Sequence, residues 1–250
     1  VPWEEASRFG LMITDETGAI TAFEEKPKNP TSNKASMGVY MFTWSKLRKY
    51  LIEDENNEAS SNDFGKDVIP AMHSAGERMF AYAFDGYWKD VGTLGSLWEA
   101  NLDLLNPSVD FNLSDSQWKI YANNPVIPPH YIASTAKVER SIIAGGSSVE
   151  GNIDYSVLFD NVEVRQGARV AYSVVMPGAV IEEGAVVQYA MVAEGAVIKK
   201  GAVVGEDPQN CTGDRQWGLT VIGPGLTVGE GAVVREDVMT ETDVKDGETV

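Results

Sequence analysis

Residues 156–204 read SVLFDNVEVRQGARVAYSVVMPGAVIEEGAVVQYAMVAEGAVIKKGAVV, a pattern in which a small residue is followed two places later by an aliphatic one. Similar pairs extend this pattern from Ala136 to Val234. The aliphatic member recurs at steps of six, six and five residues, which add to a period of 17 residues. Two inward side chains two places apart are typical of a short strand, so the period indicates three strands per turn.

A period of three short strands predicts a triangular parallel β-helix, in which each coil buries its aliphatic row by stacking on the next. We assign residues 132–250 to such a solenoid, a left-handed β-helix of hexapeptide repeats. The alternative is an antiparallel β-sandwich, which would need longer strands joined by hairpin turns.

Two features of the repeat carry further predictions. The outward position before the inward row holds Ile142, Val157, Val174 and Met191, so another domain or subunit is predicted to cover this face. Residues Gly205–Leu219 interrupt the repeat and are predicted to form a loop at a corner. The inward rows should then resume at Thr220/Ile222, Leu226/Val228 and Ala232/Val234.

Composition limits the classes of function. The chain has 250 residues and a formal net charge of −17, which argues against binding to a nucleic-acid backbone. Its one cysteine, Cys211, cannot form an internal disulfide, and no apolar run is long enough to cross a bilayer. A cytoplasmic location is therefore expected.

The first part of the chain mixes predicted strands and helices. Asp15–Gly18 is predicted to be the turn of a hairpin. Glu53–Asn62 is predicted to be a surface loop, and one strand is predicted in the linker, at Trp118–Tyr121. Further strands are predicted at Leu11–Thr14, Ile20–Glu24, Val39–Phe42 and Met79–Phe84, and helices at Trp44–Ile52, Val68–Ala75 and Leu94–Leu105.

Four short motifs in this part carry side chains suited to a polar ligand. They are FEEKP at Phe23–Pro27, SMGVY at Ser36–Tyr40, DFGKDVIP at Asp63–Pro70 and YWKDVGT at Tyr87–Thr93. Each alone has a plain interpretation: a surface ion pair at Glu25 and Lys26, a turn at Ser36, a helix N-cap at Asp63 and an Asx-turn at Asp90.

In this order, and ahead of a β-helix, the motifs resemble the bacterial ADP-glucose pyrophosphorylase family, the glucose-1-phosphate adenylyltransferases. FxEKP alone fits any sugar-1-phosphate nucleotidyltransferase, whereas SMG and DFGKD point to the glucose branch. The resemblance implies that residues 1–105 are the C-terminal part of a Rossmann-like α/β nucleotidyltransferase domain. A linker at 106–131 would lead to the solenoid.

The resemblance also implies roles for individual residues. Lys26 would pair with the phosphate of glucose 1-phosphate, and Glu25 would accept hydrogen bonds from the sugar hydroxyls. Ser36, Asp63 and Lys66 would line the same pocket, with Trp88 packed beside it. Asp90 would be a ligand of Mg²⁺, which takes few carboxylates and fills its other positions with water and phosphate oxygens. Lys26 and Asp90 are the expected catalytic residues.

The implied reaction is in-line attack of glucose 1-phosphate on the α-phosphate of ATP, with release of pyrophosphate, in glycogen synthesis. The family implies an allosteric oligomer, either a homotetramer or a hetero-oligomer with a regulatory paralogue.

The chain also departs from the family. It begins at Val1 with neither an initiator Met nor a signal-peptide pattern. The family's glycine-rich GxGTRL loop, which cradles nucleotide phosphates, has no counterpart here, and neither does its second metal-binding Asp. We therefore expect a fragment that starts midway through the catalytic domain and is inactive by itself.

Three other functions are compatible with parts of the sequence. Hexapeptide solenoids also form acyltransferases, but those usually carry a catalytic His between coils, and the two histidines here are His73, in a predicted helix, and His130, ahead of the solenoid. A non-catalytic regulatory paralogue would fit the same fold, although intact Lys26, Asp63, Lys66 and Asp90 argue against it. A pyrophosphorylase for another sugar 1-phosphate is the third alternative.

Overall fold

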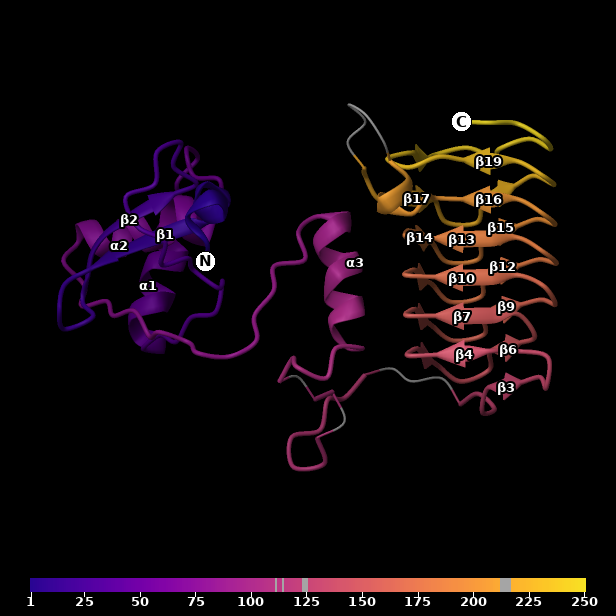
Figure 1. The fold of residues 1–250 in the computed structure, drawn as a ribbon. Coiled ribbons are helices and arrows are strands. Elements are labelled where there is room, and N and C mark those ends of the chain that lie inside the picture. The colour runs from indigo at the N-terminus through magenta and orange to yellow at the C-terminus, as the bar shows by residue number, and fades with distance from the viewer. Residues whose placement is uncertain (111, 114, 123–125, 212–216) are drawn as a thin grey trace. The chain divides into compact units, whose positions relative to one another are not determined.

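The computed structural model describes residues 1–110, 112–113, 115–122, 126–211 and 217–250 (Figure 1). The chain divides into two compact units, Val1–Trp88 and Lys89–Val250. Among the described residues, no helix is both long and apolar enough to cross a membrane.

The first unit is built around an antiparallel hairpin of β1 (Gly10–Thr14) and β2 (Ile20–Glu25). Its turn forms as predicted, because the Asp15 carboxylate accepts hydrogen bonds from the Thr17 and Ala19 amides at 2.9 and 3.0 Å. Gly18 supplies a φ of +82°. The register sets Gly10 opposite Glu25, which places the carboxylate of Glu25 at one end of the hairpin.

The first unit also contains four short helices. They are the 3₁₀-helix η1 (Trp3–Arg8), α1 (Trp44–Glu55), the π-turn η2 (Phe64–Val68) and α2 (Ile69–Ser74). Of these, α1, η2 and α2 pack together. Tyr50 of α1 and Val68 and Met72 form a small buried cluster. The two helices predicted here are confirmed, except that the second begins with one π-turn.

Three predicted strands are wrong. Val39–Phe42 and Trp118–Tyr121 are irregular, and Met79–Phe84 is reduced to an isolated bridge between Phe80 and Ala19. A strand forms only against a neighbouring strand. Among the described residues, the hairpin pairs with further segments only through single bridges, Leu11 to Ala35 and Ala19 to Phe80. Propensity alone therefore predicted strands that have no ladder.

The second unit contains a parallel β-helix, which confirms the predicted fold (Figure 1). Its described residues form three six-stranded sheets, one per face of the coil. The first sheet has β3 (Tyr131–Ile132), β6 (Ser148–Val149), β9 (Glu163–Val164), β12 (Val180–Ile181), β15 (Val197–Ile198) and β18 (Thr227–Val228). The second has β4 (Val138–Glu139), β7 (Asn152–Asp154), β10 (Arg169–Ala171), β13 (Val186–Gln188), β16 (Val203–Val204) and β19 (Val233–Val234). The third has β5 (Ile142–Ile143), β8 (Val157–Leu158), β11 (Val174–Val175), β14 (Ala190–Val192), β17 (Thr220–Ile222) and β20 (Met239–Thr240).

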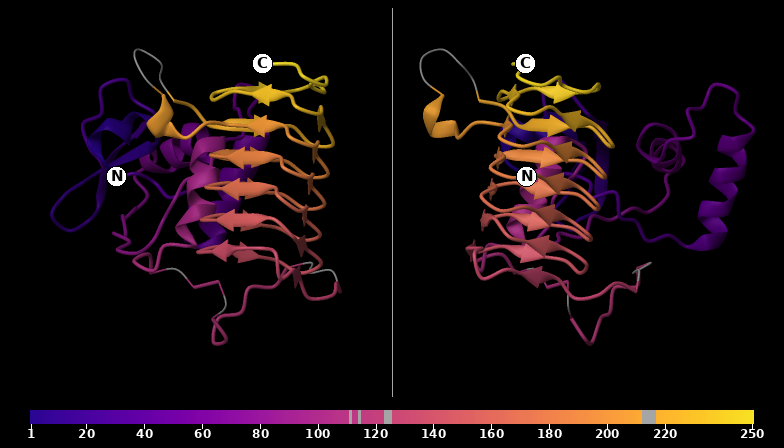
Figure 2. Two further views of the ribbon diagram at one scale, coloured as in Figure 1. Left: turned by 45° about the vertical axis from the view of Figure 1, so that its right-hand side comes forward. Right: turned by 90° about the vertical axis from the view of Figure 1, so that its right-hand side faces the viewer.

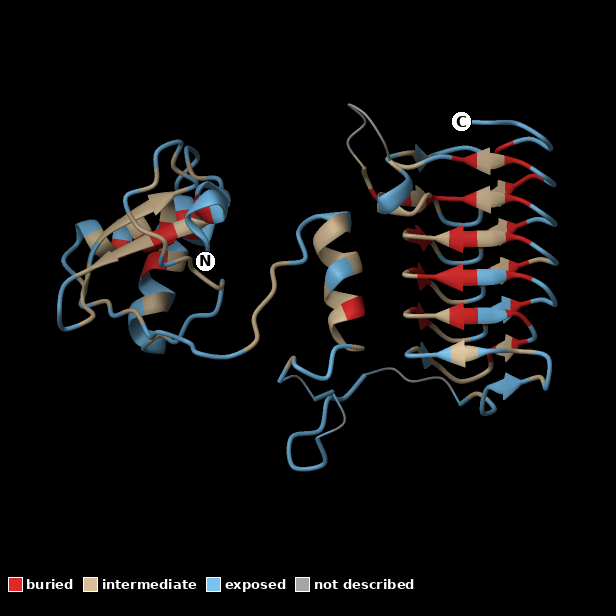
Figure 3. Ribbon diagram, in the orientation of Figure 1, coloured by how far each residue is buried: buried red, intermediate tan, exposed pale blue. Residues whose placement is uncertain are grey.

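The core of the solenoid is the stack of inward aliphatic and small residues that the sequence pattern predicts (Figure 3). Val170, Val187 and Val204 align in register across neighbouring coils, and all three are fully buried. Because each coil contacts the next through such rows, the apolar core continues along the whole stack.

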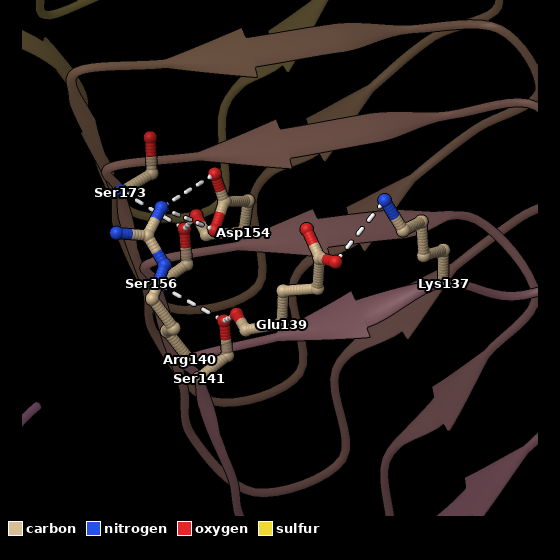
Figure 4. A network of polar contacts seen from close by, with 7 residues as sticks. All are labelled: Lys137, Glu139, Arg140, Ser141, Asp154, Ser156 and Ser173. Carbon is tan, nitrogen blue, oxygen red and sulfur yellow. Dashed lines mark hydrogen bonds and ion pairs between the residues drawn. The ribbon is translucent and has the colours of Figure 1, made fainter.

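The corner between the second and third sheets depends on left-handed residues and a column of serines (Figure 4). Tyr155 and Tyr172 have φ of +44° and +48° at this corner, and each precedes a buried serine. The Ser156 hydroxyl accepts from the Ser173 amide at 3.1 Å and donates to the Asp154 carbonyl at 2.8 Å. These bonds satisfy polar groups that would otherwise be unpaired inside the core.

One face of the solenoid is covered by α3 (Leu94–Asp103), a helix of the same unit (Figure 2). Val157, Val174 and Met191 are buried at 5, 0 and 3% exposure, in a cluster with Leu102 of the helix. The Trp98 indole N–H also donates to the Tyr172 carbonyl at 3.0 Å. The predicted covered face is therefore confirmed for these three residues, whereas Ile142 remains 41% exposed.

The interruption of the repeat occurs between β16 and β17, at the corner that Tyr155 and Tyr172 occupy in other coils. It contains the 3₁₀-helix η3 (Pro208–Asn210), and residues 212–216 of the predicted loop lie outside the described residues. Ile222, Val228 and Val234 are buried to at least 99%, so the inward rows resume in register, as predicted.

Candidate functional site

A pocket of about 410 Å³ lies in the first unit, at the end of the hairpin. It brings together three of the predicted ligand-binding residues, Glu25, Ser36 and Asp63. These side chains come from β2, from the segment after it and from the start of η2. The other lining residues are Gly10, Phe23, Gly38, Tyr40, Asn62, Phe64 and Gly65.

Glu25 occupies the most constrained position in this pocket. A Cβ atom built on either Gly10 or Gly65 would approach its carboxylate oxygen Oε2 to 2.7 Å. The absence of a side chain at both glycines therefore lets the backbone lie close to this carboxylate, and a larger residue at either position would displace it. The Glu25 carboxylate is an acceptor suited to hydroxyl donors.

Lys26 follows directly and has a strained backbone, with φ of +45°. Its amide N–H donates to the Phe9 carbonyl at 3.1 Å, which fixes the turn out of the strand. Its ammonium nitrogen lies 4.0 Å from Glu25 Oε1, and the side chain is 64% exposed. A cation at this exposed position can pair with an anionic group that enters beside Glu25.

The Ser36–Tyr40 segment forms another wall of the pocket. The Ser36 amide donates to the Gly10 carbonyl at 2.8 Å, so the segment is tied to the hairpin. The Ser36 and Tyr40 hydroxyl oxygens lie 3.0 Å apart, and the Tyr40 ring stacks on Phe64 with centroids 5.9 Å apart. This wall therefore combines two hydroxyl groups with an aromatic surface.

Asp63 caps the π-turn that closes the pocket. Its Oδ1 accepts from the Gly65 and Lys66 amides at 2.8 and 2.9 Å, so the plain interpretation as a helix N-cap also holds. A residue can serve as a cap and line a pocket with the same carboxylate.

Three predicted ligand-binding residues of the first unit, Lys26, Lys66 and Trp88, lie outside the lining of this pocket. Lys66 lines a neighbouring pocket of about 470 Å³ with Lys49, Asp54 and Asp67. The Trp88 ring packs edge-on against Phe9, with centroids 5.6 Å apart. Their roles in ligand binding stay predictions.

Asp90 belongs to the second unit. Its Oδ1 accepts from the Gly92 amide at 3.3 Å, the Asx-type contact expected from the sequence. One carboxylate is compatible with Mg²⁺, which commonly binds one or two carboxylates together with substrate phosphates. Its role as a metal ligand stays a prediction.

The residue before Asp90 is anchored to α3. The Lys89 ammonium lies 2.7 Å from Glu99 and 3.6 Å from Asp103. Partial burial acts to lower the pKa of Lys89, but the hydrogen bond and charge of Glu99, aided by Asp103, outweigh it and raise the pKa above its usual value. The ion pair therefore holds the Asp90 segment against the helix.

Sequence reasoning did not assign several of the lining residues to the site. Tyr40 and Phe64 lay inside the quoted motifs, and their aromatic character was the available signal. Gly10 and Asn62 carried no such signal, because their positions follow from the hairpin register and from a backbone φ of +56° at Asn62.

Both parts of the chain match known protein families. The family described as nucleotidyl transferase matches residues 1–107, and the GlmU-like, C-terminal hexapeptide family matches residues 128–228. A Bacillus cereus protein named glucose-1-phosphate adenylyltransferase is 56% identical over 170 residues, which are 68% of this chain and 45% of that protein. A protein of the same name from Acetivibrio thermocellus is 55% identical over 170 residues, 68% of this chain and 40% of that protein.

The chain thus spans less than half the length of these curated relatives. Helix α3 falls inside the nucleotidyl transferase match, yet its packing partners belong to the solenoid. The resemblance predicted from the four motifs is confirmed: the chain joins a nucleotidyl transferase segment to a GlmU-like hexapeptide solenoid and is similar to proteins named glucose-1-phosphate adenylyltransferase.

Proposed function

We propose that the protein is a glucose-1-phosphate adenylyltransferase, which converts ATP and glucose 1-phosphate to ADP-glucose and pyrophosphate for glycogen synthesis. The observation that carries the proposal is the pocket that joins Glu25, Ser36 and Asp63, with the Lys26 ammonium 4.0 Å from the Glu25 carboxylate. Oxygen atoms that accept hydrogen bonds from sugar hydroxyls, beside an exposed cation, suit a sugar phosphate. The names of the relatives support the same substrate.

In this proposal the residues of the pocket act by binding and orientation. Glu25 accepts hydrogen bonds from sugar hydroxyls, Lys26 pairs with the phosphate, and Ser36 and Asp63 fix the sugar. A phosphate oxygen of glucose 1-phosphate then bonds to the α-phosphorus of ATP as the bond from that phosphorus to the β-phosphate breaks. Pyrophosphate leaves with the electron pair, and no covalent protein intermediate forms.

Asp90 is proposed to bind Mg²⁺, whose charge offsets that of the nucleotide phosphates. Asp90 itself supplies one anionic oxygen ligand, and its backbone is held through the ion pairs of Lys89 with α3. Asp90→Asn should therefore reduce turnover much more than folding stability, and higher Mg²⁺ should restore part of the rate.

Cytoplasmic location and oligomeric assembly belong to the same proposal. The chain has a single cysteine, Cys211, and therefore no internal disulfide, which agrees with a reducing compartment. A homotetramer, or a hetero-oligomer with a regulatory paralogue, and allosteric control of the enzyme are proposed from the family resemblance.

The test is pyrophosphate release by the full-length protein with ATP, UTP or GTP and a panel of sugar 1-phosphates. We expect the highest kcat/KM for ATP with glucose 1-phosphate. Lys26→Gln should raise the KM for glucose 1-phosphate by about tenfold to a hundredfold, because a charge-assisted contact is lost. Lys28→Gln, at an exposed lysine two residues away, is the matched control and should leave KM unchanged.

Other outcomes would replace the proposal. A preference for UTP or for another sugar 1-phosphate would assign a different pyrophosphorylase activity. No turnover with any pair of substrates would favour a regulatory paralogue.

A further inference from the structure

The loop between α1 and η2 shapes one side of the pocket, because its last two residues, Asn62 and Asp63, are lining residues. Asn62 has φ of +56°, a left-handed conformation that is uncommon for residues other than glycine, although Asn adopts it more often than most. Both residues are exposed, so packing does not hold this conformation. The contacts that hold it must therefore be polar.

One carboxylate oxygen of Asp67 holds the backbone on both sides of Asn62. Its Oδ2 accepts from the Ser61 amide at 3.1 Å, from the Ser61 hydroxyl at 2.6 Å and from the Asp63 amide at 3.1 Å. Asp63 in turn caps the amides at the start of the turn that carries Asp67. This reciprocal pair resembles a capping box, in which each acidic side chain binds the backbone beside the other.

Asp54, at the end of α1, holds the same loop from the other direction. Its Oδ1 accepts from the Ser60 hydroxyl at 2.6 Å, and its Oδ2 accepts from the Asn62 side-chain amide at 3.0 Å. The Ser60 hydroxyl also accepts from the Asn62 amide at 3.0 Å. The backbone and the side chain of Asn62 are thus both fixed.

The loop position affects the rest of the site through η2. Gly65, two residues after Asp63, faces the Glu25 carboxylate so closely that an added Cβ would lie 2.7 Å from Oε2. A shift of the cap at Asp63 would move Gly65 and change the space around Glu25. Such a change would weaken the binding of a ligand that contacts Glu25.

We propose that Asp54 and Asp67 are positioning residues of this pocket. They hold Asn62 and Asp63 in the geometry that binds the sugar phosphate, and they do not contact the ligand themselves. The identity of the ligand rests on the proposed function, whereas the polar clamp itself rests on the hydrogen bonds alone. The Ser61 hydroxyl, followed by the Asp63 amide, lowers the pKa of Asp67, as expected for a carboxylate whose ionised form accepts these hydrogen bonds.

The catalytic test compares Asp67→Ala, Asp67→Asn and Asp54→Ala in the full-length enzyme. Asp67→Ala should raise the KM for glucose 1-phosphate at least tenfold, with the KM for ATP unchanged and kcat within about threefold. Asp67→Asn keeps one acceptor oxygen and should restore part of the affinity. Glu58→Ala removes an exposed acidic residue of the same loop and is the matched control.

A second measurement does not depend on the substrate. Amide hydrogen exchange without ligand should be at least tenfold faster at Ser61 and Asp63 in Asp67→Ala than in the wild type and Glu58→Ala. Failure of the proposed function would leave this result intact, so the two failures are distinguishable.

The proposal would be overturned by unchanged exchange at these amides. Equal increases of both KM values together with a lower melting temperature would also overturn it, because they indicate a general loss of structure.

Discussion

Internally, the two units of this chain are held together by different kinds of contact. In the solenoid, the same contact recurs in each coil, as at Val170, Val187 and Val204, and the inward residues are almost completely buried. In the first unit the pocket depends on single contacts, such as those of Asp63 with Gly65 and Lys66. The difference shows that a repeat distributes stability over many equivalent residues, whereas a binding pocket depends on a few that have no equivalents.

The largest effect is expected from the solenoid core. Ile198 is fully buried, so Ile198→Ala should lower the free energy of unfolding of the solenoid by about 2–5 kcal/mol through lost burial and a cavity. Urea unfolding measures this as a lower midpoint with an unchanged slope. Lys199→Ala, at the exposed neighbouring position, should change it by less than about 0.5 kcal/mol. Similar losses in the two variants would contradict the assignment of inward and outward rows.

The next effect concerns the helix that covers the solenoid. Leu102 is 6% exposed in the cluster with Val174 and Met191, so Leu102→Ala should cost about 2 kcal/mol and speed proteolytic cleavage near α3.

Gly95 in the same helix has open space where a Cβ would be, and Gly95→Ala should stabilise the helix by about 0.5–1 kcal/mol. For the other variant, Leu102→Ala, slower cleavage would show that α3 does not depend on the contact of Leu102 with Val174 and Met191.

A smaller effect on binding is expected from the first unit. Gly65→Ala places a methyl group 2.7 Å from Glu25 Oε2, and the carboxylate must move because it is the flexible partner. The KM for glucose 1-phosphate should rise about tenfold, equivalent to about 1.4 kcal/mol, in steady-state assays of the full-length enzyme. An unchanged KM would exclude the Glu25 carboxylate from substrate binding. Gly95→Ala serves as the control for a glycine substitution outside the pocket.

The smallest effect should come from a surface ion pair in the first unit. Glu77 accepts from the Lys46 ammonium at 2.7 Å, and this hydrogen bond is the main cause that lowers the pKa of the Glu77 carboxyl. A lowered pKa in the folded state means that the stabilisation is present above about pH 4.3, the unfolded value, and is lost as the pH falls through the folded pKa.

The measurement is the stability of the wild type and Glu77→Gln between pH 7 and pH 3. The difference between them should shrink as the pH falls. A difference that grows on acidification would reverse the sign of this interaction.

The sequence predicted the structure most completely where the pattern repeats. The inward rows, the resumption at Ile222 and the covered face at Val174 follow from a period of 17 residues, because an error in one coil would conflict with all the others. The motifs also indicated Glu25, Ser36 and Asp63, which the fold brings into one pocket.

The rest depends on contacts that no local pattern encodes. The strand predicted at Met79–Phe84 needed a partner ladder, and only one bridge to Ala19 exists among the described residues. The loop at Glu53–Asn62 was predicted only as a surface loop, although Asp54 and Asp67 fix its end. Such bonds join residues whose spacing has meaning only after the chain has folded.

In the proposed function, the first unit binds the sugar phosphate and the solenoid supports the structure without binding it. Hydrogen exchange of the full-length protein, with and without saturating glucose 1-phosphate, tests this claim most directly. We expect slower exchange at Ser36–Tyr40 and Asn62–Gly65 and no change in β8–β16 of the solenoid. Protection confined to the solenoid, or no protection at Asn62–Gly65, would contradict it.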